Sequence, residues 1–340
     1  MALDRRNFLL TLPALFGAAA CTTAETTAGG SRYVEIASSK VNGRKGTVVV
    51  FMPETKQTKD VWTGLSDELR DDFGLVAVKV EGPHSSQIIA RAMQRHAPSG
   101  VVLMNNPTVL AYREYQDKAR SATFPPAVIV MTSFLDGRPR QVAGATGISY
   151  EVPLITVVTN LRKVIHAPIE QVGVVRREPL AGFVARQAAL GKREQIRVVE
   201  ATVSADPNPS ELKAALRRLK RHCDAVWILN DDRLLSQSLI AHGWLPGLNE
   251  RPWVPAIVGA ASLVSPTQSF GTFAVLPDHT ALGVQAANLV FDVAANDWAL
   301  PPDSQIELPL STTTIMDLVQ VHERFALRAG ALSQVDRILE

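Results

Sequence analysis

Short polar and charged side chains recur just after the apolar runs of this sequence, and they are its candidates for chemistry. The positions that we select are Met52, Glu54, Asn105, Asn106, Thr132, Ser133, Ser149, Tyr150, Arg176, Asp231, Asp232, Ser262 and Asp278. Asparagine, serine and threonine both donate and accept hydrogen bonds, arginine can clamp an anion, and aspartate can hold an amine. Together these side chains suit the binding of a small polar solute.

An amino acid would use these groups in a defined way. We expect Thr132, Ser133 and Ser149 to bind its carboxylate. Asp231 would then bind its ammonium group, and Arg176 could clamp an anion. Helix N-termini that follow these loops would offer further N–H groups to a carboxylate.

Each of these residues also has an ordinary structural interpretation. Serine and threonine at helix starts are commonly caps, and Asp232 could cap a helix that begins at Arg233. Asn105, close before Pro107, is typical of a turn. The predicted site therefore depends on convergence at one edge of the sheets, because ligands of open parallel sheets bind beyond the carboxyl ends of the strands.

Motifs for catalysis are absent from the sequence. It contains no H-E-x-x-H, G-x-S-x-G, Walker A or G-x-G-x-x-G pattern. Its seven histidines are scattered without the spacing of metal ligands. His279, next to Asp278, lies near a predicted cleft edge and is interpreted as a hinge residue. We therefore expect a binding protein rather than an enzyme, with no cofactor and no metal.

The elements that would position these residues alternate between strands and helices. The first half predicts strands over residues 47–52, 75–80, 101–104 and 127–131, and helices over residues 60–72, 85–96 and 107–120. The second half predicts strands over residues 171–175, 197–201, 225–229, 255–258 and 271–276, and helices over residues 210–222, 233–242 and 280–295. Continuous apolar runs are typical of parallel strands buried on both faces. The pattern predicts an α/β protein with two lobes, each built on a doubly wound parallel sheet.

The segment from Gly144 to Pro153 separates the two halves. Its sequence is Gly-Ala-Thr-Gly-Ile-Ser-Tyr-Glu-Val-Pro, and a helical run begins near Val152. Glycine permits backbone angles that other residues resist, and proline suits the first turn of a helix. We interpret this segment as a hinge that also faces a cleft.

Three stretches of this sequence resemble a known family. They are the hinge run "GATGIS" at residues 144–149, "DAVWILNDD" at residues 224–232 and "LPDHTALGVQAA" at residues 276–287. Their order and spacing resemble ABC transporter substrate-binding proteins with the type I periplasmic-binding fold, in the branch that includes aromatic amino-acid receptors. The resemblance covers roughly residues 47–318. It implies two lobes joined by a multi-strand hinge, a small solute such as an amino acid as ligand, and an ABC permease as partner.

The same resemblance implies how the chain divides. The first lobe would contain residues 46–143 and 278–302, and the second lobe residues 144–277 and 303–340. The chain would return to the first lobe near Pro277 and leave it again near Pro301. Three crossings between the lobes would make a hinge with limited twist.

The first residues indicate export. Residues 1–20 combine Arg5-Arg6 with a short apolar run, as in a twin-arginine signal peptide, and Cys21 follows small residues as in a lipobox. Cys21 would then carry a lipid anchor in a membrane; a plain cut after Ala20 is the alternative. Residues 21–45 are expected to form a flexible tether. The predicted location is the periplasm, at a membrane.

Composition excludes other classes. With 46% hydrophobic and 20% charged residues the chain is globular, and a net charge of +2 is too small for a nucleic-acid footprint. The basic run at residues 213–221 alternates with leucines and predicts an amphipathic helix with a solvated face. Cys223 is interpreted as a buried small residue.

The sequence leaves the ligand and the role open. Tyr150, Phe51 and Phe134 are its only candidates for stacking on an aromatic ligand. The alternative to a transport receptor is a sensor or interaction protein of the same fold, coupled to a membrane receptor or kinase.

Overall fold

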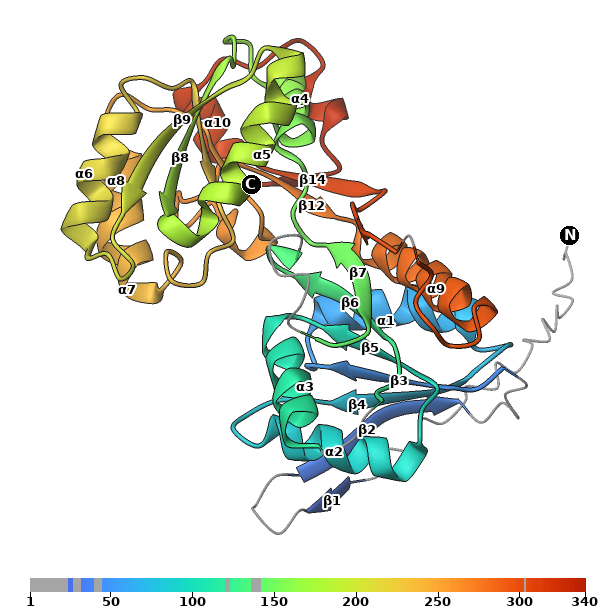
Figure 1. Cartoon of the computed structure of the whole chain (residues 1–340). Coiled ribbons are helices and arrows are strands. Elements are labelled where there is room, and N and C mark those ends of the chain that lie inside the picture. The colour runs from blue at the N-terminus through green and yellow to red at the C-terminus, as the bar shows by residue number, and fades with distance from the viewer. Residues whose placement is uncertain (1–23, 27–31, 40–44, 120–122, 136–141, 303) are drawn as a thin grey trace, which may run out of the picture.

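Two α/β lobes joined by a narrow connection make up the molecule (Figure 1). The computed structural model describes residues 24–26, 32–39, 45–119, 123–135, 142–302 and 304–340. Each lobe is a mostly parallel sheet with helices on both faces, so the predicted fold class is confirmed. The predicted signal peptide and Cys21 lie outside the described residues. In the described part of the chain, no helix combines the length and the apolar character needed to cross a membrane.

The first lobe has an eight-stranded sheet with the order β1-β2-β4-β3-β5-β6-β7-β13. Its strands are β1 (Ala24–Thr26), β2 (Arg32–Ser39), β3 (Thr47–Met52), β4 (Gly74–Lys79), β5 (Gly100–Met104), β6 (Ala127–Thr132), β7 (Ala145–Ser149) and β13 (Ile306–Glu307). Its helices are α1 (Lys56–Leu69), α2 (Ser85–His96), α3 (Asn106–Lys118) and α9 (His279–Ala295). Alternate residues of β3 pack on α1 and α9 on one face and on α2 and α3 on the other, which is why this strand is apolar throughout.

The second lobe has a seven-stranded sheet with the order β15-β14-β12-β11-β10-β8-β9. Its strands are β8 (Gln171–Arg177), β9 (Arg197–Val203), β10 (Ala225–Ile228), β11 (Ala256–Val258), β12 (Phe273–Pro277), β14 (Thr312–Asp317) and β15 (Arg337–Leu339). Its helices are α4 (Leu154–Val164), α5 (Ala181–Gly191), α6 (Pro209–Leu219), α7 (Gln237–Leu239), α8 (Leu245–Asn249) and α10 (Leu318–Arg324). Short helical turns are η2 (Glu178–Leu180), η3 (Lys192–Glu194), η4 (Ile240–Trp244), η5 (Ala261–Leu263) and η6 (Ala331–Gln334). Among the described strand pairs of this sheet, β12 and β14 are antiparallel and the others are parallel.

One expected helix differs from the structure. The sequence predicts a single helix over residues 233–242, but the helical stretch begins at Gln237 and continues through η4 into α8. The residues before it are turns, because the backbone N–H groups of Arg233 and Leu235 are held by the side chain and the carbonyl oxygen of Asp231.

Part of the expected tether is a strand. Residues 32–39 form β2, which pairs antiparallel with β4 at the edge of the first sheet. Tyr33 is only 1% exposed, and its hydroxyl donates to Glu35 over 2.9 Å. Residues 33–37, Tyr-Val-Glu-Ile-Ala, are mostly aromatic, β-branched or apolar and so suit a strand, unlike the Thr/Ala/Gly-rich residues before them on which the expected tether is based.

The lobe boundary also differs from the expected one. β7, expected in the second lobe, pairs parallel with β6 in the first sheet. Gly147 permits this close pairing, because a Cβ atom there would come within 2.1 Å of the Ile129 carbonyl oxygen. β13 joins the same sheet beside β7, so the returning segment extends beyond residue 302 to Glu307. The chain passes between the lobes after β7, after β12 and between β13 and β14.

The returning helix α9 packs closely along α1, with Gly64 and Gly283 at the points of contact. A Cβ atom on Gly283 would lie 2.1 Å from the Val61 carbonyl oxygen, and one on Gly64 would lie 2.1 Å from the Thr280 carbonyl oxygen. Each glycine therefore lets the backbone of the other helix approach. This contact holds α9, the helix that follows the crossing after β12, against the first lobe.

Cys223 lies just before β10 and is 8% exposed, which confirms its interpretation as a buried small residue. Burial raises the pKa of its thiol to about 11. Because the thiolate is the reactive form, we expect iodoacetamide at pH 8 to leave Cys223 unmodified in the folded protein and to alkylate it in denaturant. Mass spectrometry of the chain from Thr22 onward measures this directly. Rapid alkylation of the folded protein would show that this thiol is open to solvent.

Candidate functional site

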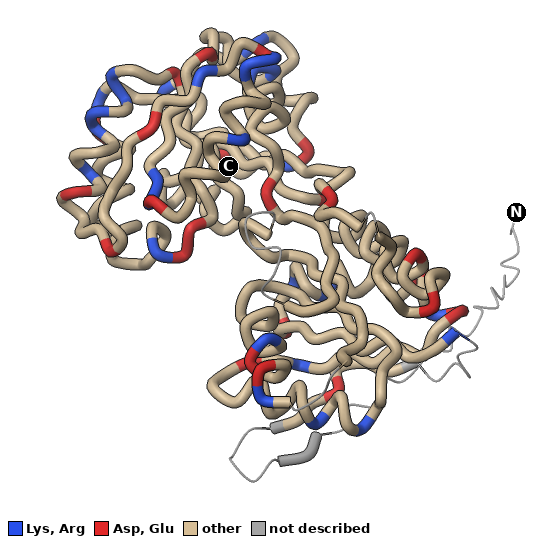
Figure 2. The backbone as a smooth tube through the Cα atoms, viewed as in Figure 1, with Lys and Arg blue, Asp and Glu red and all other residues tan. Residues whose placement is uncertain are grey.

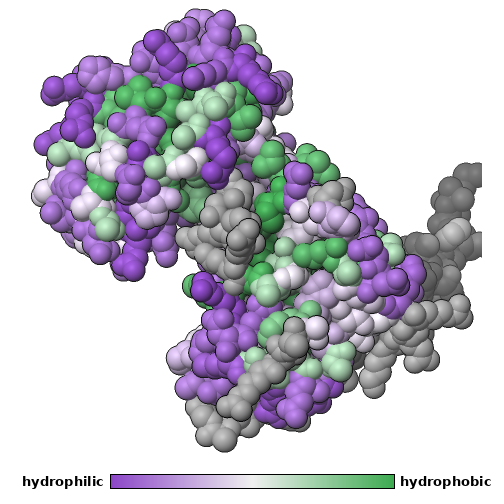
Figure 3. Space-filling view, in the orientation of Figure 1, coloured by the Kyte–Doolittle hydropathy of each residue, from purple (hydrophilic) through white to green (hydrophobic). Residues whose placement is uncertain are grey.

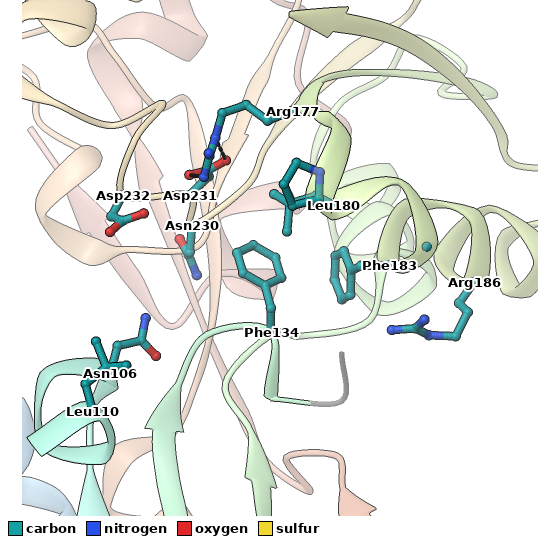
Figure 4. A pocket seen from close by; sticks show the side chains of 12 residues that line it. Asn106, Leu110, Phe134, Arg177, Leu180, Phe183, Arg186, Asn230, Asp231 and Asp232 are labelled. Atoms are coloured by element: carbon teal, nitrogen blue, oxygen red, sulfur yellow. Dashed lines mark hydrogen bonds and ion pairs between the residues drawn. The ribbon is translucent and has the colours of Figure 1, made fainter. Parts of the chain in front are cut away.

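A cavity of about 390 Å³ lies between the two lobes, beyond the carboxyl ends of their strands. The first lobe contributes three of its lining residues, Asn106, Leu110 and Phe134. The second lobe contributes the rest, Arg177, Pro179, Leu180, Gly182, Phe183, Arg186, Asn230, Asp231 and Asp232. This is the edge at which the sequence places its candidate residues, and Figure 4 shows the side chains on both sides of the opening.

Aromatic rings form one wall of the cavity. Phe134, from the end of the first lobe's β6, extends toward the second lobe and meets Phe183 of α5 (Figure 4). The two ring centroids are 5.0 Å apart and the ring planes are inclined at 75°. Phe51, the other phenylalanine considered for stacking, is fully buried in the first lobe's core and does not line the cavity. Apolar residues also gather at the waist where the lobes join (Figure 3).

Arg177 and Asp231 form a buried ion pair at the cavity. Arg177 Nε and Nη2 donate to the two Asp231 carboxylate oxygens over 2.8 and 2.7 Å. The Asp231 side chain is 1% exposed and that of Arg177 is 17% exposed. The hydrogen bonds that Arg177 donates to Asp231 raise the pKa of Arg177. Both charges are therefore neutralised within the protein. The role expected of Asp231, binding a ligand ammonium, stays a prediction, and in this structure both carboxylate oxygens already accept hydrogen bonds from Arg177.

Arg176 does not line the cavity. Its guanidinium donates to Glu200 of β9 and, over 3.2 Å, to Glu178, and Glu200 raises its pKa. Neighbouring residues of a strand point to opposite faces, so Arg177 reaches the cavity and Arg176 does not. The expected anion clamp at Arg176 stays a prediction that the cavity lining does not support, and Arg177, the arginine of this strand at the cavity, is itself paired with Asp231.

The hydroxyl groups expected to bind a carboxylate surround a carboxyl group instead. Ser149 Oγ donates to Glu151 Oε2 over 3.3 Å, and the Ser133 hydroxyl also donates to Glu151. Thr132 Oγ1 donates to the Val130 carbonyl oxygen over 3.4 Å. A ligand carboxylate placed on Ser133 and Ser149 would face the like charge of Glu151. The expected carboxylate site stays a prediction, and in this structure the two serine hydroxyls already bind Glu151.

Glu151 is the residue that sequence reasoning missed. It lies in the crossing after β7, is 6% exposed, and its Oε2 accepts a 2.7 Å hydrogen bond from the Phe134 backbone N–H. Burial raises its pKa to about 7, although the hydrogen bonds that it accepts lower the pKa. An acidic residue inside the hinge run, between Tyr150 and Val152, was the available signal, because acids seldom stand between buried neighbours without a role.

The raised pKa of Glu151 predicts how stability depends on pH. The folded protein binds this proton more tightly than the unfolded chain, so stability present below the unfolded pKa is lost as the pH rises through about 7. We expect a loss of about 3 kcal/mol in the free energy of unfolding between pH 4.5 and pH 7.5. Urea unfolding of wild type and Glu151→Gln across this range isolates the effect. Parallel curves for the two proteins would show that Glu151 is not the group responsible.

Several other candidates have structural partners close to the cavity. Asn105 caps α3, because its side-chain oxygen accepts a hydrogen bond from the Thr108 N–H at 3.0 Å. This is an ordinary structural role. Asn106 accepts from the Ser133 N–H at 3.0 Å and also lines the cavity. Asp232 lines the cavity and accepts from the Arg233 N–H at 2.9 Å. Asp278 caps α9 by accepting from the Ala281 N–H at 3.0 Å.

The remaining candidates lie away from the cavity. Met52 is 1% exposed and belongs to the first lobe's core. Glu54 is exposed and pairs with Lys59 and Lys79. Ser262, in η5, is exposed and outside the cavity lining. Tyr150 stands at the hinge, where its hydroxyl is 3.0 Å from His279 Nε2 and the two rings stack.

One further cavity residue could have been inferred from the sequence, and two could not. Asn230 precedes the acidic pair in the same turn after β10, so the strand-end rule applies to it. Phe183 and Arg186 lie on α5 rather than at a strand end, and only the orientation of that helix over the cleft brings them to the cavity. Among the described residues, no group of three or more His, Cys, Asp or Glu side chains could hold a metal ion.

The basic helix expected over residues 210–222 is α6. Basic positions gather along this part of the second lobe (Figure 2), and Lys213 and Arg217 both pair with Glu250. These two ion pairs lower the pKa of Glu250 to about 2. The charges of this face are thus partly balanced by an acidic neighbour, as on an ordinary solvated surface.

Three solved structures resemble this fold over most of their length. A protein described as an ABC domain in complex with L-Trp, from Streptococcus pneumonia, has 14% sequence identity and a TM-score of 0.54, with 86% of this chain and 100% of that chain covered. A conserved domain protein from Vibrio cholerae has 17% identity and a TM-score of 0.56, with 86% and 99% covered. A substrate-binding protein with adhesive properties from Clostridium difficile, in its ligand-free, open form, has 12% identity and a TM-score of 0.58, with 86% and 98% covered.

Sequence comparison adds nothing to these similarities, since no protein-family model and no curated protein matches the chain. The likeness is one of fold, that of two α/β lobes built on mostly parallel sheets with flanking helices. By its structure, therefore, this chain has the type I periplasmic-binding fold that is found in substrate-binding proteins of ABC transporters.

Proposed function

We propose that this protein is the solute-binding component of an ABC-type uptake system and binds one small solute between its lobes. The observation that carries the proposal is the cavity of about 390 Å³ that both lobes line. Cavities of this size suit small molecules, and their specificity usually comes from a few polar groups in an apolar wall. Here the polar groups are the amides of Asn106 and Asn230, and the wall is formed by Phe134, Phe183 and Leu180.

Binding would act by closure. Asn106 belongs to the first lobe and Asn230 to the second, so a solute that contacts both favours the conformation in which the lobes are close. Three chain segments join the lobes, and such a connection permits bending around the hinge. The closed form would present surfaces of both lobes to a membrane permease. The solved relatives in complex with L-Trp and in a ligand-free, open form support a cycle of this kind for the fold.

Export and anchoring belong to the same proposal. The twin arginines at Arg5 and Arg6 would direct the folded protein to the periplasm, and Cys21 would carry lipid that holds it at a membrane. We expect Arg5→Lys with Arg6→Lys to retain the protein in the cytoplasm, because the twin-arginine route recognises that pair. Cys21→Ser should release an exported protein from the membrane fraction into the soluble periplasm. Unchanged fractionation of both variants would contradict this part of the proposal.

The test of solute binding is a thermal-shift screen of the chain from Thr22 onward. The panel contains amino acids, amines, organic acids, nucleosides and short peptides. A solute at 100 times its dissociation constant adds about 2.7 kcal/mol to the stability of the folded state, a shift of several degrees. We expect at least one class of solute to give such a shift. A folded protein that responds to none of them would contradict a solute-binding role.

A further inference from the structure

One oxygen of the Glu151 carboxyl group lacks a partner. Oε2 accepts hydrogen bonds from the Phe134 N–H and from serine hydroxyls, whereas Oε1 is buried without any hydrogen bond. The side chain as a whole is 6% exposed. A buried polar atom without a partner costs free energy, and such atoms are rare in folded proteins. Glu151 Oε1 at the hinge is therefore a buried hydrogen-bond acceptor without a donor.

Among the described residues, no cationic side chain forms an ion pair with Glu151. Within the described ranges, none of the ion pairs includes this carboxyl group, and the side chains that bond to it are neutral serines. Tyr150 stands beside it, with His279 on the Tyr150 hydroxyl. Strands β10, β11 and β12 approach from the second lobe with Trp227, Leu229, Val258 and Val275.

A small cavity of about 20 Å³ lies at this point, between the hinge and the second sheet. Glu151 and Tyr150 line it from the hinge, and Asn230 and Gly259 line it from the second lobe. This space accommodates a single group the size of a water molecule. Asn230 also lines the larger cavity, and the Phe134 N–H that binds Glu151 belongs to that cavity's aromatic wall. The two cavities are thus neighbours on either side of these residues.

We propose that Glu151 Oε1 binds the ammonium group of the solute, so that the protein takes a primary amine with an apolar or aromatic body. A terminal ammonium has the size of the small cavity and the donors and charge that the carboxylate lacks. The body would lie against Phe134 and Phe183 in the larger cavity. This inference rests on the proposed solute-binding function and specifies its ligand class.

The charges at the cleft favour an amine over an acid. Asp231 is neutralised by Arg177 and Asp232 is exposed to solvent, which leaves Glu151 as the buried acidic group at the cavities with an oxygen that has no hydrogen bond within the described chain. A ligand carboxylate beside it would meet like charge, whereas an ammonium would offset the cost of keeping the Glu151 charge buried. Replacing the carboxylate by an amide of the same shape removes that attraction.

Proton release is the signature of this pairing. Burial brings the pKa of free Glu151 to about 7, and an ammonium at Oε1 would favour the charged form. Amine binding below pH 7 must therefore displace a proton, and affinity should fall up to about tenfold for each unit by which the pH drops below 7. Burial also lowers the pKa of His279, whose ring nitrogen contacts the Tyr150 hydroxyl. His279→Gln therefore serves as a control for the pH profile.

The experiment titrates three probes that share a phenyl ring into the chain from Thr22 onward. The probes are phenethylamine, L-phenylalanine and 3-phenylpropionate. Calorimetry at pH 8 measures the dissociation constant of each. We expect the two amines to bind and 3-phenylpropionate to bind at least tenfold more weakly. Glu151→Gln should weaken the amines roughly a hundredfold. Glu170→Gln, the same change at an exposed position of the same lobe, should have no effect.

A second measurement needs no variant. Calorimetry of phenethylamine at pH 6 in two buffers with different ionisation enthalpies should show the release of about 0.9 proton per bound amine. Equal affinities for the amine and the acid, no proton release, or no effect of Glu151→Gln would overturn the ammonium site. If these results came with binding of another solute from the screen, the proposed solute-binding function would stand. If nothing in either panel bound, both proposals would fall.

Discussion

Asp231→Ala is expected to lower the free energy of unfolding by about 3–5 kcal/mol, even without a ligand. The reason is the ion pair with Arg177, in which two hydrogen bonds of 2.8 and 2.7 Å join side chains that are 17% and 1% exposed. Removal of the carboxylate leaves a mostly buried guanidinium without its counter-charge. It also removes the Asp231 hydrogen bond to the Arg233 N–H in the turn that follows β10. Urea unfolding at pH 7 measures the change.

The neighbouring acid provides the matched control. Asp232→Ala removes an exposed carboxylate that bonds only to a backbone N–H, and it should cost no more than about 1 kcal/mol. The double variant Arg177→Met with Asp231→Leu should recover most of the loss, because replacing both charges leaves no unpaired ion. If Asp231→Ala and Asp232→Ala lowered the free energy of unfolding equally, the buried ion pair would not contribute to the stability of the fold.

Gly283→Leu should destabilise the first lobe by about 3 kcal/mol or more. The Cβ atom of the new side chain would lie 2.1 Å from the Val61 carbonyl oxygen, a backbone atom of α1 that cannot move aside as a flexible side chain can. The two helices must separate, and contacts of Leu282 and Ala286 with the first sheet's core would loosen. Thermal unfolding followed by circular dichroism measures the loss.

A helical glycine in open space controls for the substitution itself. Gly182, on α5, would place a Cβ atom no closer than 3.6 Å to the end of the flexible Arg186 side chain. Gly182→Ala should therefore stabilise the protein by about 0.5–1 kcal/mol through its better helix propensity. Gly283→Ala should still destabilise it. If both alanine variants were equally stable, the close contact between α1 and α9 would not exist in solution.

Most of the fold could be predicted because its physical causes are local. Strands β3, β5, β6, β8 and β10 are short apolar runs within a residue or two of their predicted positions, and helices alternate with them. Strand β2 was not predicted, because its place depends on distant partners: β4 pairs with it at the sheet edge, and His96 of α2 contacts both Tyr33 and Glu35. The lobe of β7 was not predicted either. Its pairing depends on the approach of Gly147 to Ile129, which no local pattern reveals.

The location of the candidate site could be predicted, but its chemistry could not. The rule that ligands bind beyond the carboxyl ends of strands places Asn106 and the acidic pair at the cavity. It does not say which charges are already paired. The choice between Arg176 and Arg177 depends on which face of β8 points to the cleft, and the fate of Asp231 depends on the long side chain of Arg177. Glu151 follows a strand end by two residues, and only its burial and its bond to Phe134 single it out.

The central claim is that one solute contacts both lobes, and a titration with one variant in each lobe tests it most directly. The solute with the largest thermal shift is titrated into wild type, Asn106→Ala and Asn230→Ala, with Asn160→Ala, outside the cavity lining, as control. Loss of a buried hydrogen bond should weaken binding about tenfold in each cleft variant and leave the control unchanged. A variant of either lobe that binds like wild type would contradict a solute held between the lobes.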